Sequence, residues 1–165
     1  MIPIGKTAPD FTAPKAGGEA YDDVESFTLS SVLGDGPVVL AFVPAAFTGG
    51  CTTEMCSFRD SMADFDAVDA LVYGVSVDLP YAQNVWMREE GLNFPMHSDT
   101  TRDVIRAYDV VLDAHDGLFE TAERAIVVIN AAGQVSATWI REDGNPDFEA
   151  LVSWTRTAVE KAVAQ

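Results

Sequence analysis

Three continuous apolar segments constrain the fold of this chain more than any other feature of its sequence. They occupy residues 38–43, 71–77 and 125–129, are rich in β-branched or aromatic residues, and are too short for typical helices. Apolar residues that run on without alternation are typical of strands covered by helices on both faces. The three segments therefore predict a central β-sheet buried between helices.

Helical patterns lie between and after these segments. We expect helices over residues 52–68, 81–90 and 101–108, and a last helix with Asn145 as its N-cap and Pro146 at its first helical position. The first helix carries an apolar stripe that is expected to face the core, made of Met55, Phe58, Met62 and Phe65. The last helix has an apolar face made of Phe148, Leu151, Val152 and Val159.

Two hairpins complete the expected arrangement. Residues 1–30 predict an N-terminal β-hairpin that turns near Gly17 and Gly18, and residues 135–140 are expected to pair antiparallel with the third apolar segment. The chain is long enough to bury a substantial core. With no linker or internal repeat in view, we expect one domain over residues 1–165.

Cys51 has the clearest chemical signature in the sequence. It follows the first apolar segment through the loop 44–50 and stands where the first helix begins. Unpaired backbone N–H groups and the positive end of the helix dipole favour a thiolate at such a place. The thiolate is the nucleophilic form of cysteine, so this position indicates redox or covalent chemistry. The alternative is a small buried hydrophobic residue.

The residues around Cys51 resemble the active site of a known family. Pro44, Thr48 and Cys51 match the Pro-x-x-x-Thr-x-x-Cys motif of the peroxiredoxins at full spacing, and Arg124, at the head of the third apolar segment, matches an arginine of that family. The resemblance begins near Gly5, in Gly-Lys-Thr-Ala-Pro-Asp-Phe, and covers nearly the whole chain. It implies an α/β fold, a thioredoxin-like sandwich with a central mixed sheet flanked by helices.

The resemblance also implies a role for each matched residue. Cys51 would attack the O–O bond of a hydroperoxide and become a sulfenic acid. Thr48 and Arg124 would hold and polarise the peroxide, and Pro44 would shield the cysteine. Without the resemblance, Arg124 reads as a surface arginine paired with Glu123.

Glu54, three residues after Cys51, has two interpretations. It is either an acid in the first turn that interacts with the helix dipole, or a group that orients Arg124. Its charge would oppose ionisation of a neighbouring thiol, so we do not count it among the catalytic residues.

Cys56 decides between two mechanisms. Its position five residues after Cys51 resembles the bacterioferritin-comigratory group, in which such a cysteine resolves the sulfenic acid. Five helical residues rise by about 7.5 Å, so a disulfide requires the first turns of the helix to unwind. The segment 86–95 instead resembles the alkyl hydroperoxide reductase E group, which often works with one cysteine. We favour a resolving role for Cys56 and leave the one-cysteine mechanism open.

No cofactor or metal is expected. His97 and His115 are far from each other and from the cysteines in sequence, so no metal-ligand spacing is present. We expect both histidines to lie at the surface or to be satisfied by hydrogen bonds.

The charge balance is strongly acidic. Ten Lys and Arg residues stand against 26 Asp and Glu residues, which gives a net charge of −16. Such a field opposes binding to nucleic acid or to an anionic membrane, and no apolar run approaches the roughly 18 residues needed to span a bilayer. The start of the sequence lacks the pattern of a secretory signal, so we expect a cytoplasmic protein. The excess of aspartate over lysine is similar to the surfaces of proteins from extreme halophiles.

These features together predict a thiol-dependent peroxidase that acts on hydrogen peroxide or organic hydroperoxides. It would need an external thiol reductant, either thioredoxin- or glutaredoxin-like or of low molecular weight. Two alternatives remain, a thioredoxin-type thiol–disulfide oxidoreductase and a redox-sensing or chaperone-like binding protein switched by Cys51. The missing Cys-x-x-Cys argues against the first. We also expect a homodimer, with Phe47 at the contact.

Overall fold

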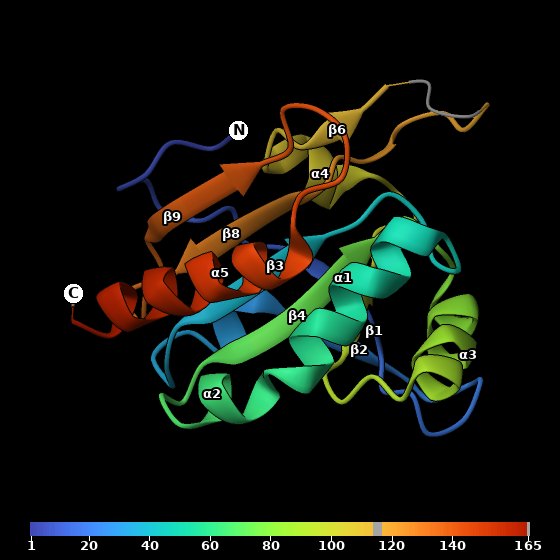
Figure 1. The fold of residues 1–165 in the computed structure, drawn as a ribbon, viewed down its shortest axis with the longest axis horizontal. Coiled ribbons are helices and arrows are strands. Elements are labelled where there is room, and N and C mark those ends of the chain that lie inside the picture. Colours follow the sequence, from blue (N-terminus) through green and yellow to red (C-terminus); the bar gives the residue numbers. More distant parts are fainter. Residues whose placement is uncertain (114–116, 165) are drawn as a thin grey trace.

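A seven-stranded mixed β-sheet forms the centre of the molecule (Figure 1). The computed structural model describes residues 1–113 and 117–164, and within them the strands run in the order β2-β1-β5-β4-β3-β8-β9. The strands are β1 (Thr12–Ala16), β2 (Val24–Thr28), β3 (Val38–Phe42), β4 (Leu71–Ser76), β5 (Met96–Ser98), β8 (Ala125–Ile129) and β9 (Val135–Ile140). A separate two-stranded sheet consists of β6 (Val111–Leu112) and β7 (Thr121–Ala122).

The three apolar segments form the adjacent central strands β4, β3 and β8. β3 is parallel to β4 and antiparallel to β8, and every residue of β3 and of β8 is buried. This confirms the prediction that these strands are covered on both faces. The prediction that helices form both covers holds for one face, because α4 shares the other with residues near the N-terminus. The two predicted hairpins are also confirmed, since β1 pairs with β2 and β8 pairs with β9, both antiparallel.

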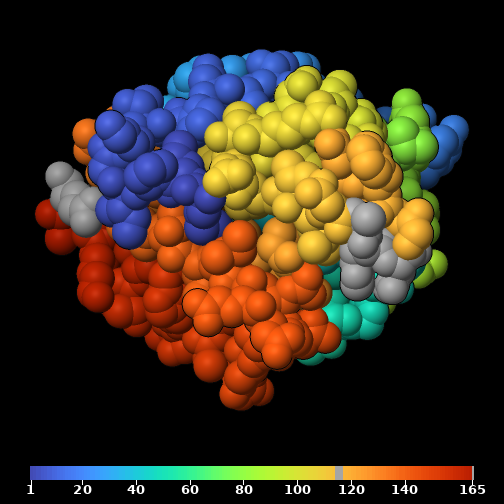
Figure 2. Space-filling model, turned by 90° about the horizontal axis from the view of Figure 1, so that it is seen from above, coloured from blue at the N-terminus to red at the C-terminus, as the bar shows by residue number. Residues whose placement is uncertain are grey.

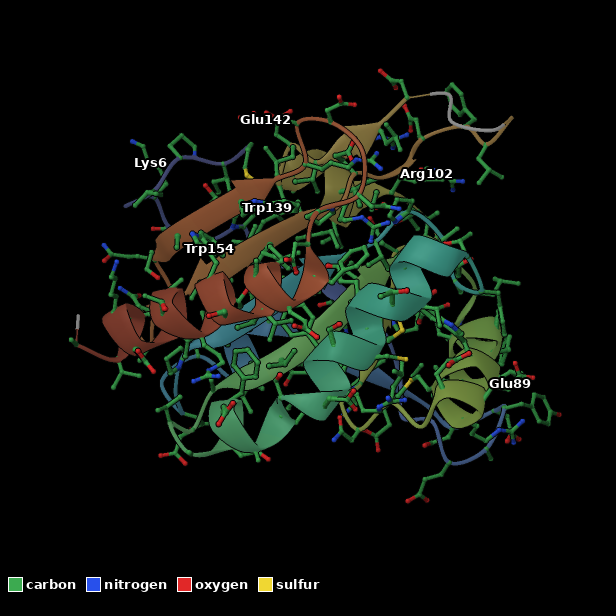
Figure 3. All side chains as sticks on the ribbon, viewed as in Figure 1. Lys6, Glu89, Arg102, Trp139, Glu142 and Trp154 are labelled. Atoms are coloured by element: carbon green, nitrogen blue, oxygen red, sulfur yellow. The ribbon has the colours of Figure 1, made fainter. Side chains whose placement is uncertain are left out.

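Helices cover the two faces of the sheet unequally. The helices are α1 (Gly49–Asp60), α2 (Met62–Asp66), α3 (Pro80–Glu90), α4 (Asp103–Ala107) and α5 (Phe148–Val163), and residues Leu29–Ser31 form a short 3₁₀ helix. Side chains of α1, α2, α3 and α5 pack into the hydrophobic core on one face. Figure 3 shows Trp139 of β9 and Trp154 of α5, both of which pack against this core. The opposite face is covered by α4 and by residues near the N-terminus.

The N-terminal residues lie against the segment that contains α4. The backbone N–H of Ile2 donates to the carbonyl of Tyr108 at 3.2 Å, and Gly5 donates to Val135 at 2.8 Å. In Figure 2 the N-terminal segment (blue) accordingly lies beside the residues drawn in yellow. The start of the chain thus covers part of the hydrophobic cluster on the face of the sheet that carries α4.

The structure corrects the predicted boundaries of two helices. The predicted helix 52–68 is two helices, because Ser61 leaves the helical region with ψ of 4°. Its apolar stripe continues across the break, and all four residues of the stripe are buried. The last helix begins at Phe148 with Asp147 as its N-cap, whose carboxylate accepts the N–H of Ala150, so the prediction of Asn145 as the cap was wrong.

Three strands were not predicted. β5 has three residues, and β6 and β7 have two each, so none is long enough to show a period. Within the described residues, no helix is both long and apolar enough to span a membrane.

Candidate active site

Cys51 lies at the edge of the sheet where the C-terminal end of β3 leads into α1. Thr48 occupies the N-cap position, and Cys51 follows Gly49 and Gly50 in the first turn of the helix. Its side chain is 1% exposed. The first turn of the helix, with its free backbone N–H groups and the positive end of the helix dipole, thus surrounds the position of Cys51.

Arg124 reaches Cys51 from the neighbouring antiparallel strand. The first residue of β8, Ala125, pairs with Phe42 at the end of β3, so Arg124 lies at the same edge of the sheet as Cys51. Its Nη2 donates to the Sγ of Cys51 at 3.5 Å. The guanidinium thus places a hydrogen-bond donor and a positive charge next to the sulfur.

Glu54 holds the arginine in this position. Its Oε2 accepts a hydrogen bond from the Nη1 of Arg124, and both side chains are buried. The ring of Phe148 lies 5.3 Å from the guanidinium carbon and adds a cation–π contact. Of the two interpretations of Glu54, the one in which it orients Arg124 is therefore correct. The interpretation of Glu54 as an acid in the first turn is wrong, because α1 begins at Gly49 and Glu54 lies beyond its first turn.

Arg124 does not form the surface pair with Glu123 that its sequence neighbour suggested. Glu123 instead pairs with Arg141, with 2.7 Å between Oε1 and Nη2, and also accepts the backbone N–H of Arg124 at 2.7 Å. The guanidinium of Arg124 instead contacts the active-site helix. Its Nη1 donates to Glu54 and its Nη2 donates to Cys51.

Burial and the neighbouring charges act in opposite directions on Arg124 and on Glu54. Burial by itself lowers the pKa of the Arg124 guanidinium, but the neighbouring Glu54 and Cys51 raise it by more, so Arg124 remains charged. Burial raises the pKa of the Glu54 carboxyl, against the opposing attraction of Arg124. Arg124 therefore places a positive charge beside the sulfur.

Thr48 and Pro44 complete the set of residues predicted from the motif. The hydroxyl of Thr48 does not cap the helix but donates to the carbonyl of Ala45 at 2.8 Å. A hydroxyl that donates its own proton in this way still has lone pairs with which it accepts a second hydrogen bond. Pro44 is buried directly after the strand.

The structure brings the four predicted residues together around one pocket of about 300 Å³. Its lining comprises Pro44, Ala45, Thr48, Gly50, Cys51, Leu118, Arg124, Arg141, Gly144 and Asn145. The lining includes the apolar side chain of Leu118 and the two arginines. The pocket has room for an alkyl group beside the two oxygens of a hydroperoxide.

Gly50 allows the close approach of the residues that line this pocket. A Cβ atom at this position would lie 2.9 Å from Nδ2 of Asn145 and 3.1 Å from Nη2 of Arg124. At the preceding Gly49, by contrast, a Cβ atom would meet nothing within 4 Å. Only the second glycine is therefore required by the packing around Cys51.

Cys56 lies further along α1 and faces α3 rather than the pocket. Its Sγ is 3.7 Å from Oε2 of Glu90, and its side chain is partly buried. Burial raises the pKa of the Cys56 thiol, the positive charge of Arg59 opposes this, and Glu90 adds to it. Both cysteines are free thiols in one intact helix, as the helix geometry requires.

Sequence reasoning missed two polar residues of the pocket, Arg141 and Asn145. Arg141 follows the edge strand β9, and Asn145 was interpreted as a helix cap. No motif marks either residue. Only the length of the β8–β9 hairpin, which returns the chain to the edge of the sheet that carries Cys51, points to them.

The histidines are not part of this site. His97 is fully buried in β5, and within the described residues neither ring nitrogen has a hydrogen-bond partner. The expectation of a surface or hydrogen-bonded histidine was thus wrong for His97, because aromatic rings surround it. His115 lies outside the described residues. Among residues 1–113 and 117–164, no group of three or more His, Cys, Asp or Glu side chains is arranged to hold a metal ion.

Comparison with known proteins agrees with this geometry. The model of the AhpC/TSA family matches residues 4–138. A protein of Coxiella burnetii named as a peroxiredoxin, bcp, is 31% identical over 148 residues, which cover 87% of this chain and 93% of that protein. Peroxiredoxin-2 of Mus musculus is 37% identical over 137 residues, 79% of this chain, but the match spans only 65% of the mouse protein.

A solved structure extends the similarity to the fold. The crystal structure of the peroxidoxin BcpB of Mycobacterium tuberculosis has a TM-score of 0.83 and 29% sequence identity to this chain, and the alignment covers 98% of both chains. The thioredoxin-like fold is therefore confirmed. The match to the family model and the identity to full-length relatives lead to one conclusion: the chain belongs to the AhpC/TSA family, and within it to the peroxiredoxins.

Proposed function

We propose that this protein is a thiol-dependent peroxidase that reduces hydroperoxides at Cys51. The observation that carries the proposal is the position of the Cys51 sulfur, which is buried beside a pocket, 3.5 Å from Nη2 of a charged arginine. A buried thiolate beside a fixed guanidinium is suited to attack an oxygen whose leaving partner becomes negatively charged.

The first proposed step is the oxidation of Cys51 by the hydroperoxide. The Cys51 thiolate attacks one oxygen of ROOH, a sulfur–oxygen bond forms, and the O–O bond breaks. Cys51 is oxidised to the sulfenic acid, and the RO⁻ leaving group takes up a proton to become ROH. The hydroxyl of Thr48 accepts the O–H of the hydroperoxide, while Arg124 donates to the oxygen on which charge develops. Pro44 keeps water from the sulfur.

The sulfenic acid is then resolved by Cys56 in the same chain. The Cys56 thiol attacks the Cys51 sulfur, a disulfide forms, and water leaves. Because a separation of five residues along α1 is too long for a disulfide, the first turns of the helix must open. Opening also removes Cys56 from Glu90, which together with burial keeps its thiol protonated in the intact helix. An external dithiol, or two monothiols, of the thioredoxin or glutaredoxin class or of low molecular weight returns both cysteines to thiols.

Mass spectrometry after one equivalent of peroxide tests both steps. The wild type is expected to become about 2 Da lighter, as a Cys51–Cys56 disulfide forms, and Cys56→Ser is expected to become about 16 Da heavier at Cys51. A stable sulfenic acid in the wild type would leave Cys51 as the nucleophile but would exclude Cys56 as the resolving residue. An unmodified Cys51 in both proteins would refute the peroxidase itself.

The environment proposed for this activity is the cytoplasm, and the proposed assembly is a homodimer. Phe47 beside the active site supports the dimer, since its side chain is 52% exposed although it is large and apolar, and its ring contacts Trp86. Leu79 and Tyr81 add exposed apolar surface from the loop and helix that follow β4. Light scattering at micromolar concentration tests this proposal, and a monomer in both redox states would reject it.

A further inference from the structure

We propose that Asp78 is a positioning residue for peroxide reduction, and that it acts on the Thr48 hydroxyl through the peptide group between Ala45 and Ala46. The inference rests on the proposed peroxidase function and adds a residue to it. Asp78 is separated by 27 residues from Cys51 and belongs to no motif recognised around that cysteine.

Two contacts hold the opposite ends of one peptide group. The N–H of Ala46 donates to Oδ2 of Asp78 at 2.9 Å. The carbonyl of Ala45, which belongs to the same amide plane, accepts the hydroxyl of Thr48 at 2.8 Å. Because an amide is planar and rigid, the carboxylate of Asp78 fixes the direction of the carbonyl that binds Thr48.

Asp78 is itself held by the neighbouring strands. It follows β4, and its carbonyl accepts the buried hydroxyl of Ser98, at the end of β5, at 2.6 Å. β3, β4 and β5 are parallel, so their C-terminal ends lie at one edge of the sheet. The carboxylate therefore reaches the active-site loop from a rigid part of the fold.

The loop needs such a contact because its backbone is strained. Phe47, the next residue after this peptide, has φ of 64°, which non-glycine residues rarely adopt. A hydrogen bond to a charged acceptor contributes more than one between neutral groups. Without the carboxylate, the peptide is free to rotate between the Cα atoms of Ala45 and Ala46, and its carbonyl turns away from Thr48.

The orientation of the Thr48 hydroxyl decides what it offers to the substrate. While it donates to Ala45, its lone pairs accept the O–H of a hydroperoxide. Once that carbonyl has turned away, the hydroxyl proton competes with the hydroperoxide proton for the same space. Loss of Asp78 should therefore slow the reaction with peroxide and leave the reactivity of the thiol itself unchanged.

The test compares two reactions of Cys51 in a Cys56→Ser background, so that one thiol is observed. Asp78→Ala should slow the reaction of Cys51 with hydrogen peroxide by about tenfold, the effect of one hydrogen bond to a charged group. Iodoacetamide should alkylate Cys51 of this variant at the same rate as in the parent. Asp78→Asn, whose amide oxygen still accepts, should stay within about threefold of the parent, since it replaces a charged acceptor with a neutral one. The charge-matched control is Asp22→Ala, at an exposed site in the β1–β2 loop, and it should change neither rate.

A double-mutant cycle with Thr48→Val tests the route. If Asp78 acts through Thr48, Asp78→Ala should cost nothing further in the Thr48→Val protein. Equal slowing in both backgrounds, equal slowing of alkylation, or a normal peroxide rate in Asp78→Ala would overturn the proposal. If Asp78→Ala does not fold by circular dichroism, Asp78→Leu, which fills the volume without an acceptor, takes its place. A parent protein that does not react with peroxide would instead refute the peroxidase function.

Discussion

Replacement of His97 by phenylalanine should remove the contribution of this residue to the acid sensitivity of the fold. The imidazole lies in a box of aromatic rings, with centroid distances of 4.1 Å to Phe27, 4.6 Å to Tyr73 and 5.6 Å to Phe11. Burial, followed by the nearby positive charge of Lys15, lowers the pKa of His97 from 6.5 to about 3. The folded protein therefore holds this side chain neutral over the range in which the unfolded chain protonates it.

The sign and size of the effect follow from these two pKa values. Below pH 6.5 the unfolded chain binds a proton that the folded chain excludes, so stability falls as the pH falls, until the folded form also protonates near pH 3. At about 1.4 kcal/mol per pH unit, the wild type should lose about 2 kcal/mol between pH 7.5 and pH 5 through this residue alone. His97→Phe keeps an aromatic ring in the box and has nothing to protonate.

Urea unfolding at a series of pH values measures this difference. Every other titrating group is common to the two proteins, so the gap in unfolding free energy between His97→Phe and the wild type should widen by about 2 kcal/mol from pH 7.5 to pH 5. Should the variant pack poorly, the imidazole resonances of His97 in the wild type report the same property and should not titrate between pH 8 and pH 5. A constant gap, or a His97 resonance that titrates near pH 6.5, would refute the reasoning.

Three further predictions follow from the active site and the surface. Glu54→Gln should destabilise the fold by about 3 kcal/mol, because it leaves the buried charge of Arg124 without its partner. It should also slow the reaction with peroxide. An unchanged urea midpoint would show that the ion pair does not stabilise the fold. Gly50→Ala should slow peroxide reduction by about threefold to tenfold, because the new Cβ displaces Arg124 by less than the 1 Å that costs about a hundredfold in rate. In the matched control Gly49→Ala the new Cβ meets nothing within 4 Å, so this variant should react normally. Equal rates in the two variants would contradict this account. The net charge of −16 should make the melting temperature rise by several degrees between dilute buffer and molar potassium chloride, as about 2–4 °C accompanies each kcal/mol of relieved repulsion, and a flat or falling dependence would exclude a halophile-like surface.

The parts of the fold that the sequence predicted are those with a strong local signal. β3 and β8 are apolar throughout and β4 is apolar over most of its length, a pattern typical of buried strands. Both hairpins follow from adjacent segments. β5 was missed because its three residues form a strand only through their neighbours, β4 and β1. β5 consists of Met96, His97 and Ser98. A three-residue strand is too short to show an alternation of apolar and polar residues, and two of its three buried residues are polar.

The same distinction holds for the active site. Pro44, Thr48 and Cys51 are contiguous enough to form a motif, whereas Arg124 required a resemblance to a family, since its distance from Cys51 along the chain carries no pattern. Asp78 contacts the loop from the segment that follows β4, and only the three-dimensional structure shows this contact.

The interpretation of the last helix failed for a related reason. Asn145 and Pro146 look like a helix start, but Asn145 lines the pocket beside Gly50, and the next acid, Asp147, caps the helix instead. The helix therefore begins two residues later than the local pattern predicted.

The most direct test of the central claim is the steady-state consumption of hydrogen peroxide with a dithiol reductant by the wild type, Cys51→Ser and Cys56→Ser. The wild type should turn over, and Cys51→Ser should show no consumption above the uncatalysed reaction of the dithiol. Cys56→Ser should still react once per chain at Cys51, because the attacking sulfur and its arginine are intact. Normal turnover by Cys51→Ser would contradict the account, since it would place the chemistry at a different residue.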